Sequence, residues 1–318
     1  MKKINRVIIF TEGGDNIGFG HITRCSALYE EIESRNIEVL FVIFGKNIDD
    51  LLKGKKYLNK DWKDKEFLKT FLKEDDYIII DSYLADIEIY KFISESTKKC
   101  LYIDDNNRIS YPKGIILNPV LYDDVVYKTE NIVLQGKDYI ILRKEFLETT
   151  TDTVEKNIDV LITLGGTDIR NLTPKLLQII KRINSKLKIA VVIGKAFDNI
   201  EKIEKEKNDN IEFYYNLSAL EMKEIILKSK NIICGCGQSI NELLYLKANF
   251  FPIVIADNQI NNSESLIKLK IVNEISNWKD ENLDKKIKKF FEKEKNEREL
   301  NFKNGLKNIV NIFLGGEN

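Results

Sequence analysis

The stretch "RVIIFTEGGDNIGFGHITRC", residues 6–25, predicts how the fold begins. It opens with the β-branched run "RVIIF", passes through a glycine-rich loop, and enters a segment from about residue 21 to 35 with apolar residues at helical spacing. A short run that is apolar on both faces is typical of a parallel strand covered by helices. The order of strand, glycine-rich loop and helix therefore predicts the first element of a doubly wound α/β domain.

The same alternation continues through the rest of the chain. A polar, threonine-rich stretch at 149–153 interrupts it and is predicted to be a linker. Further strand-like runs lie at 39–44, 77–81, 100–104 and 114–118 before it, and at 159–168, 187–194, 211–215, 231–237 and 250–256 after it. We therefore expect two Rossmann-like domains, 1–150 and 151–318, that face a central cleft, with one or two closing helices at 281–313 in the second.

The composition excludes several classes of partner. The chain has 318 residues, with 50 basic and 50 acidic side chains, so its formal charge of zero argues against nucleic acid and membrane surfaces. Four cysteines and one histidine are too few for a disulfide scaffold or a zinc cage. The apolar run near the N-terminus is too short for a signal peptide, and no stretch has the length of a membrane span. We expect a reduced, cytoplasmic monomer or weak dimer without membrane insertion.

The glycine-rich loop resembles a dinucleotide site only superficially. Its glycines stand at 13, 14, 18 and 20, which does not match G-x-G-x-x-G, and the next strand does not end in an acidic residue. NAD binding is therefore disfavoured.

His21 is the single histidine of the chain and follows Gly20 directly. At a helix start the positive end of the dipole favours the neutral imidazole that a general base needs. A structural or capping role is the alternative. We prefer catalysis, because Gly18 and Gly20 leave the side chain uncrowded in a loop at the carboxyl end of a strand.

Two glycine-rich turns of the second half are candidates for nucleotide binding. In "GCGQSINE" the backbone of Gly237, Gln238 and Ser239 is suited to a pyrophosphate, and Glu242 to ribose hydroxyls. A favourable contact between Glu242 and the helix dipole is the simpler alternative. In "LGGTD" the residues Gly165, Gly166 and Thr167 form either a phosphate-binding loop or a plain tight turn.

Several motifs together resemble one family. "NIGFGHITRC", "DSY", "IDDN", "GKDYIILRKEF", "LGGTDIRNLT", "GCGQSINELL" and "ADNQ" are similar to the nucleotide-sugar hydrolases of the pseudaminic-acid pathway, which in turn resemble the MurG-like GT-B glycosyltransferases. The resemblance runs from about residue 6 to 262. It implies a GT-B-like fold and release of UDP from UDP-2,4-diacetamido-2,4,6-trideoxy-β-L-altropyranose or a similar UDP-sugar by water, without a metal or another cofactor.

The resemblance also implies roles for individual residues. The catalytic histidine of the family matches His21, its tyrosine matches Tyr83, and its substrate-contacting asparagine matches Asn258, next to Gln259. The family's phosphate- and ribose-binding helix start matches Gly237, Gln238, Ser239 and Glu242.

The sequence departs from the family pattern at three positions. Ser82 stands where the family commonly has histidine, Phe10 where it often has arginine, and Gln238 where it usually has serine. The first two are expected near the sugar, so the resemblance does not specify the sugar.

Two other functions stay open at this point. A GT-B glycosyltransferase would use His21 to deprotonate an acceptor hydroxyl in place of water. A binding protein without catalysis would hold a UDP-sugar and release nothing. The highly charged segment 47–75 shows no long apolar patch for a lipid acceptor, which favours water.

Overall fold

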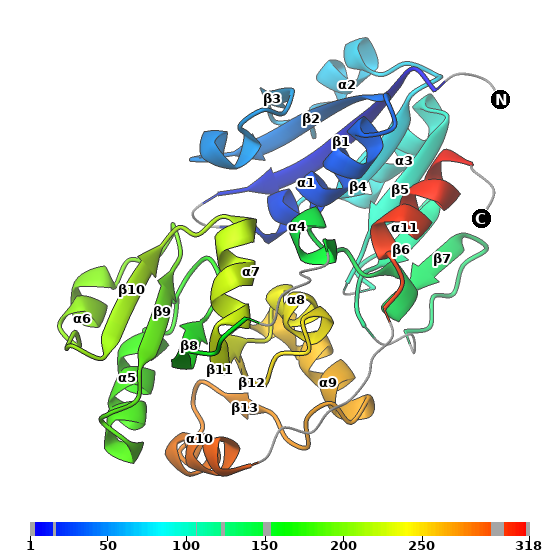
Figure 1. Ribbon diagram of the computed structural model, residues 1–318. Helices are drawn as coiled ribbons and strands as arrows, with labels where there is room; N and C mark the ends of the chain where they lie inside the picture. The colour runs from blue at the N-terminus through cyan, green and yellow to red at the C-terminus, as the bar shows by residue number, and fades with distance from the viewer. Residues whose placement is uncertain are drawn as a thin grey trace. The chain divides into compact units, whose positions relative to one another are not determined.

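The computed structural model describes residues 4–14, 17–105, 107–121, 125–148, 154–293 and 302–315, apart from the side chain of Asn258. The chain forms two compact units, and each contains its own parallel sheet (Figure 1). The first unit comprises Met1–Leu142 together with Phe302–Asn318, and the second comprises Arg143–Asn301. The expected linker at 149–153 lies outside the described residues.

The first unit contains a seven-stranded sheet in the order β3-β2-β1-β4-β5-β6-β7, and every pairing is parallel. Its strands are β1 (Arg6–Gly13), β2 (Glu38–Gly45), β3 (Tyr57–Asn59), β4 (Tyr77–Asp81), β5 (Lys99–Ile103), β6 (Ile115–Asn118) and β7 (Ile132–Gln135). Its helices are α1 (Gly20–Glu33), α2 (Lys65–Phe71), α3 (Ile87–Ser96) and α11 (Gly305–Leu314), with short 3-10 turns η1 (Asp49–Leu52) and η2 (Lys137–Tyr139).

Helices cover both faces of this sheet because successive strand residues point to opposite sides. Val42 belongs to the cluster that packs against α2 and α3. Its neighbour Phe41 stacks on Tyr29 of α1, with ring centroids 5.1 Å apart. On α11, Phe313 lies edge-on to Tyr77, and the red α11 is seen beside the blue α1 in Figure 1.

The second unit repeats the plan with a six-stranded parallel sheet in the order β10-β9-β8-β11-β12-β13. Its strands are β8 (Ile158–Thr163), β9 (Ile189–Ile193), β10 (Ile211–Tyr215), β11 (Ser229–Gly235), β12 (Phe250–Val254) and β13 (Ser276–Asn277). Its helices are α4 (Lys144–Leu147), α5 (Leu172–Ile183), α6 (Ile200–Glu204), α7 (Ala219–Leu227), α8 (Ser239–Tyr245), α9 (Ile260–Lys268) and α10 (Leu283–Glu292), with the 3-10 turn η3 (Asp257–Gln259).

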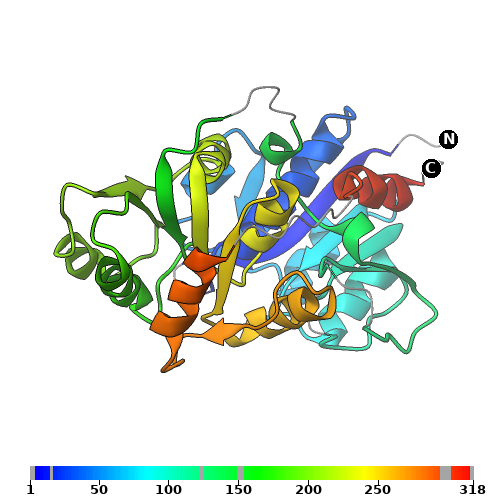
Figure 2. The same cartoon turned by 60° about the horizontal axis from the view of Figure 1, so that its bottom comes forward.

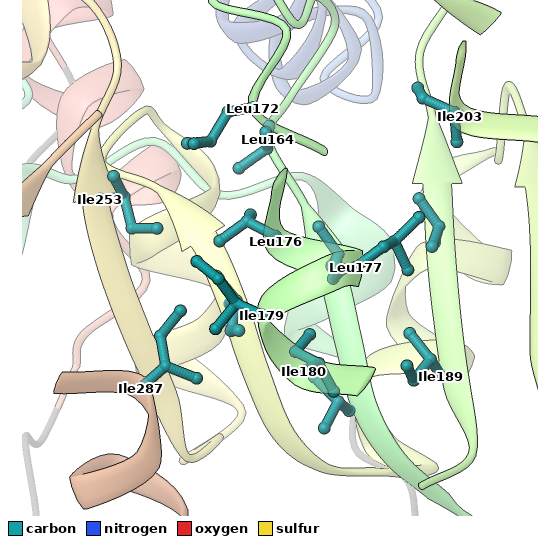
Figure 3. Packing of buried hydrophobic residues seen from close by; sticks show 14 of the residues in the cluster. Leu164, Leu172, Leu176, Leu177, Ile179, Ile180, Ile189, Ile203, Ile253 and Ile287 are labelled. Carbon is teal, nitrogen blue, oxygen red and sulfur yellow. The ribbon is translucent and has the colours of Figure 1, made fainter. Parts of the chain in front are cut away.

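Two apolar layers stabilise the second unit, one on each face of its sheet. On one face, Ile162 of β8 belongs to a cluster with residues of α5 and α10. Figure 3 shows Leu176 and Ile180 of α5 and Ile287 of α10 from this cluster. Figure 2 shows the orange α10 beside the green α5. On the other face, Leu161 packs with α4, α7, α8 and α9. Each sheet is thus covered on both sides, as the two-sided apolar runs predicted.

The last helix belongs to the first unit, whereas the sequence placed all of 281–313 in the second domain. The predicted closing helices are present as α10 and α11, but α11 returns to the first unit and packs there beside α1. Three contacts anchor it: Arg35 donates to Asn311 Oδ1, Lys99 to the carbonyl of Ile312, and Asn308 to the carbonyl of Asp138. Among the described residues, no helix is long and apolar enough to cross a membrane.

Candidate functional site

The parallel pairing of β1 with β4 brings two acidic strand ends together in the first unit. Thr11 is in register with Asp81, so Glu12 and Asp81 lie at the same edge of the sheet. Glu12 Oε1 accepts hydrogen bonds from the backbone N–H groups of Tyr83, at 2.5 Å, and Leu84, at 3.1 Å. This carboxylate therefore holds the turn that follows β4.

The glycine-rich loop places His21 beside this edge. Gly14 and Gly18 exchange backbone hydrogen bonds of 3.1 and 2.7 Å, which closes the loop before α1. Gly18 has a φ of +84°, a conformation that favours glycine. A side-chain carbon added at Gly18 or Gly20 would meet no atom within 4 Å. The space that the sequence predicted around these two glycines is present.

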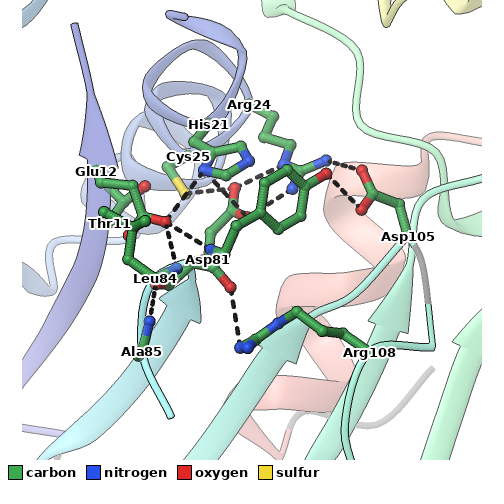
Figure 4. Close-up of polar contacts among 12 residues, drawn as sticks. Thr11, Glu12, His21, Arg24, Cys25, Asp81, Leu84, Ala85, Asp105 and Arg108 are labelled. Atoms are coloured by element: carbon green, nitrogen blue, oxygen red, sulfur yellow. Dashed lines mark hydrogen bonds and ion pairs between the residues drawn. The ribbon is translucent and has the colours of Figure 1, made fainter. Parts of the chain in front are cut away.

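His21 is buried among acidic and aromatic side chains (Figure 4). Its Nδ1 atom lies 4.0 Å from Glu12 Oε1 and 4.0 Å from Asp81 Oδ1. Its ring meets the Tyr83 ring edge to face, with centroids 4.4 Å apart. Within the described part of the chain, His21 Nδ1 and Glu12 Oε2 have no hydrogen-bond partner. The structure thus brings the two residues of this half with predicted catalytic roles, His21 and Tyr83, into contact.

Arg24, one turn after His21 on α1, joins two carboxylates. Its Nε and Nη2 atoms donate to the two oxygens of Asp81, at 2.6 and 2.5 Å, and Nη1 donates to Asp105 at 2.8 Å. The Tyr83 hydroxyl donates to the other Asp105 oxygen at 2.7 Å. Arg24 thereby links α1, β4 and the loop after β5 and fixes the Tyr83 ring against His21.

The pKa values in this network follow from burial and pairing. Burial opposes ionisation of Asp105, but Arg24 and the hydrogen bonds from Arg24 and Tyr83 outweigh it, so the Asp105 pKa is lowered. Burial and then the Asp105 charge raise the pKa of Tyr83. Burial also raises the pKa of the Cys25 thiol. At neutral pH the tyrosine and the thiol are therefore uncharged, and the Asp105 carboxylate is ionised.

Two of the three residues that depart from the family pattern, Phe10 and Ser82, are buried. Phe10 is fully buried, and its ring lies tilted against that of Trp62, with centroids 5.1 Å apart. The expectation that Phe10 lies near the sugar is therefore wrong, because its strand position points into the core. Ser82 is buried too, and its hydroxyl accepts from the N–H groups of Leu84 and Ala85. Ser82 therefore shapes the turn that carries Tyr83.

In the second unit, the predicted "LGGTD" turn follows β8. Gly165 and Gly166 are exposed and Thr167 is half-buried. Gly165 has a φ of +99° and open space around it. The buried Asp168 closes the turn by accepting from the N–H groups of Leu172 and Thr173 at 2.8 and 2.9 Å. This leaves the backbone of the two glycines accessible.

The "GCGQSINE" turn follows β11 and is held by side chains near η3. Gln259 Oε1 accepts from the N–H of Ile255 at 3.0 Å, and Asn262 donates to the carbonyl of Cys236 at 3.1 Å. A carbon added at Gly237 would lie 3.8 Å from Gln259 Nε2. Gln238 and Ser239 are half-buried where α8 begins. The backbone of Asn258 lies in η3, and its side chain is outside the described residues.

Glu242 has a partner that the sequence reasoning did not identify. Arg143 Nε and Nη2 donate to Glu242 Oε1 and Oε2, at 2.6 and 2.9 Å. Burial raises the Glu242 pKa, and the Arg143 charge opposes that rise. Both Glu242 oxygens accept from Arg143, so any hydroxyl that donates a hydrogen bond to Glu242 shares an oxygen with that guanidinium.

Sequence reasoning did not identify Glu12, Arg24, Asp81 and Asp105 as parts of this site. The sequence did contain a signal for Glu12 and Asp81, because each follows or ends a short apolar run that predicts a strand. The two strands are parallel neighbours in the sheet, so their acidic ends lie side by side. Among the described residues, no group of three or more His, Cys, Asp and Glu side chains is arranged to hold a metal ion.

Comparison with curated proteins supports the resemblance that the motifs suggested. The chain is 28% identical to the UDP-2,4-diacetamido-2,4,6-trideoxy-beta-L-altropyranose hydrolase of Campylobacter jejuni, over 83% of this chain and 96% of that protein. It is 28% identical to an uncharacterized protein of Methanocaldococcus jannaschii over 79% of this chain. It is 24% identical over 81% of its length to a Helicobacter pylori protein named as pseudaminic acid cytidylyltransferase and the same hydrolase. The matches span about half of these last two proteins, 55% and 46%.

Solved structures show the same fold. Acinetobacter baumannii MurG has a TM-score of 0.59 at 11% identity, with 90% of each chain covered. The UDP-GlcNAc 2-epimerase of Methanocaldococcus jannaschii, in complex with UDP-GlcNAc and UDP, also has a TM-score of 0.59, at 15% identity over 98% of this chain and 100% of that one. No protein-family model matches the chain. The predicted GT-B-like α/β fold of two Rossmann-like domains is confirmed.

Proposed function

We propose that the chain is a hydrolase that releases UDP from a UDP-linked di-N-acetylated 6-deoxy sugar, in pseudaminic-acid or related surface-polysaccharide biosynthesis. The substrate is UDP-2,4-diacetamido-2,4,6-trideoxy-β-L-altropyranose or a close relative of it. The similarity to the Campylobacter jejuni hydrolase, over 96% of that protein, supports this substrate class.

The observation that carries the catalytic proposal is the setting of His21. The imidazole is buried beside carboxylates at the carboxyl edge of a parallel sheet, where ligands of α/β proteins bind, and its glycine-rich loop leaves open space next to it. A buried, oriented histidine with a carboxylate behind it is an arrangement suited to general base catalysis.

The reaction proceeds as one displacement. His21 takes a proton from water, the water oxygen forms a bond to the anomeric carbon, and the bond from that carbon to the β-phosphate oxygen breaks. The electron pair stays with UDP, and His21 later gives its proton to solvent. Attack on the face opposite the leaving group inverts the anomeric configuration.

Residues of the second unit are proposed to bind the nucleotide. The accessible backbone at Gly165, Gly166 and Gly237 suits phosphate oxygens; Gln238 caps α8, and Ser239 and Glu242 lie in its first turn. A nucleoside diphosphate is a stable leaving group, so neither a second carboxylic acid nor a metal ion is needed to protonate or neutralise it before it departs.

Incubation with UDP-linked amino sugars tests the proposal, with UDP measured by chromatography and the sugar anomer by NMR. We expect UDP to appear without an added acceptor and in the presence of a chelator, with the inverted anomer as the first product. Release that requires a sugar or lipid acceptor would identify a glycosyltransferase instead. Loss of release after chelation would contradict metal independence.

His21→Ala separates catalysis from binding. We expect turnover to fall by about 10²–10⁴-fold, the usual contribution of a general base, while UDP affinity measured by calorimetry stays unchanged. If UDP affinity falls in parallel with turnover, His21 is a binding residue. If the wild-type chain binds the UDP-sugar tightly and releases nothing, the chain is a binding protein.

A further inference from the structure

We propose that Glu12 is the positioning residue for His21. By accepting a hydrogen bond from Nδ1–H, Glu12 keeps the imidazole proton on Nδ1 and so leaves Nε2 to accept the proton of the attacking water. This inference rests on the proposed function, because it assigns a partner to the proposed base. Two carboxylates compete for that part, since Glu12 and Asp81 both lie 4.0 Å from Nδ1. Distance alone does not distinguish them, but their other contacts do.

Asp81 is already paired with a cation. Both of its oxygens accept short hydrogen bonds from the buried guanidinium of Arg24, at 2.5 and 2.6 Å, and the Cys25 thiol lies 3.5 Å from one of them. A carboxylate that is paired in this bidentate way is held in the geometry of the guanidinium and has fewer lone pairs left for an imidazole. Asp81 is therefore a partner of Arg24 first.

Glu12 has the opposite character. It is 1% exposed, and its Oε1 atom accepts from two backbone N–H groups, while Oε2 has no hydrogen-bond partner in the described part of the chain. No ion pair with Lys or Arg joins Glu12 among the described residues. His21 Nδ1 is likewise buried and without a hydrogen bond there. A buried donor and a buried acceptor that both lack partners gain stability when they meet.

The gap between the imidazole and this carboxylate is small, since Nδ1 lies 4.0 Å from Oε1, the oxygen that also accepts from the backbone. Moving the imidazole toward the carboxylate by about 1 Å would reach hydrogen-bond distance. Catalytic hydrogen bonds are often long in unliganded enzymes and shorten when substrate binds. The 4.0 Å separation is therefore compatible with an interaction that forms fully in the working enzyme.

The charges that face His21 favour the same assignment. Arg24 carries one positive charge against the negative charges of Asp81 and Asp105, and Tyr83 and Cys25 are uncharged because burial raises the pKa of each. Glu12 adds a carboxylate from β1 that forms no ion pair with Lys or Arg among the described residues. When His21 takes a proton from water, Glu12 is the charge beside the resulting imidazolium.

The single histidine makes this inference directly testable. Labelling the full chain with ¹⁵N-histidine gives the signals of one imidazole, whose nitrogen shifts report the tautomer and the titration without substrate. In wild type we expect the neutral form to carry its proton on Nδ1. Glu12→Gln keeps an oxygen for the two backbone N–H groups but removes the charge. We expect its imidazole to populate the Nε2–H tautomer and to titrate about one pH unit lower.

Kinetics of the same variants give a second readout. We expect Glu12→Gln to lower kcat about 10²-fold and to move the acidic limb of the kcat/KM profile downward together with the NMR midpoint. Glu12→Asp retains the charge and should restore the Nδ1–H tautomer and much of the rate. Asp81→Asn serves as the contrasting variant and should leave the tautomer as in wild type.

Two outcomes would overturn the inference. In the first, Glu12→Gln leaves both tautomer and titration unchanged. In the second, Asp81→Asn changes them and Glu12→Gln does not. Because the NMR readout needs no turnover, failure of the proposed function is recognised separately: it appears as a wild-type chain that releases no UDP from any UDP-sugar, whatever the tautomer of His21.

Discussion

Arg143 and Glu242 form a bidentate ion pair inside the second unit, although 99 residues separate them in the chain. Arg143 is the residue at which that unit begins, and Glu242 lies on α8 beside the proposed phosphate loop. The pair therefore fixes the orientation of the carboxylate proposed to bind the ribose.

Arg143→Met should destabilise the chain by about 1–3 kcal/mol at pH 7, because it leaves the buried Glu242 carboxylate unpaired, while the partial exposure of Arg143 moderates the loss. Without Arg143 the pKa of Glu242 rises further above its unfolded value. The destabilisation should therefore be absent below about pH 4 and grow as the pH rises. Urea unfolding of wild type and variant across this range measures it. The double variant Arg143→Met/Glu242→Gln should recover stability, and a double variant as unstable as the single one would argue against an unpaired charge as the cause.

Arg24→Met should cost about 3–5 kcal/mol of stability at neutral pH, because it removes the cation that Asp81 and Asp105 share and leaves the buried Asp81 carboxylate without its ion pair. In wild type the Asp105 pKa is lowered, so its stabilisation is present above the unfolded value of about 3.9 and is lost as the pH falls through the folded value. The difference between wild type and variant should shrink below about pH 4. Denaturation midpoints at several pH values test this, with Arg24→Lys expected in between. A difference that does not change with pH would contradict it.

Tyr83→Phe should reduce turnover only about 2- to 10-fold, because the hydroxyl is engaged with Asp105 and the ring that contacts His21 stays in place. Tyr83→Ala removes the ring and should lower turnover much further. Steady-state UDP release by both variants distinguishes these contributions. Equal losses in the two would mean that the hydroxyl itself acts on the substrate.

Gly20→Ala should leave stability unchanged or slightly higher, since the added methyl group meets no atom within 4 Å and alanine favours a helix by about 0.5–1 kcal/mol. If that space admits the sugar, kcat/KM should still fall about 10-fold or more. Ser34→Ala, at the other end of α1, is the control and should leave the kinetics unchanged. Wild-type kinetics in Gly20→Ala would show that the space is not used.

Most strands could be predicted from sequence because their buried residues form continuous apolar runs. β3, β7 and β13 were not predicted, and all three are short outer strands. β3 ("YLN") has three residues and β13 ("SN") has two, and neither contains an apolar series. β7 ("IVLQ") has four residues, and its apolar run is only three residues long. The helical spacing of 305–314 was visible, but the unit on which α11 packs depends on contacts with Arg35 and Lys99, far away in the chain.

The candidate site was predictable to the extent that it is local. His21 follows from its glycines and its place after a strand. The proximity of Asp81 to His21 depends on the register of β1 with β4, and the pair of Arg143 with Glu242 joins residues 99 positions apart. Such contacts leave no spacing pattern in a single sequence.

Because α11 returns to the first unit, a break in the second unit also affects the first. The second unit is a continuous insertion between Leu142 and Phe302, whereas the first is assembled from two separate pieces of polypeptide. A break anywhere inside the insertion severs the covalent link between Phe313 and the strand residue Tyr77 that it packs against. The stability of the half that carries His21 is thus tied to the integrity of the half that is proposed to bind the nucleotide.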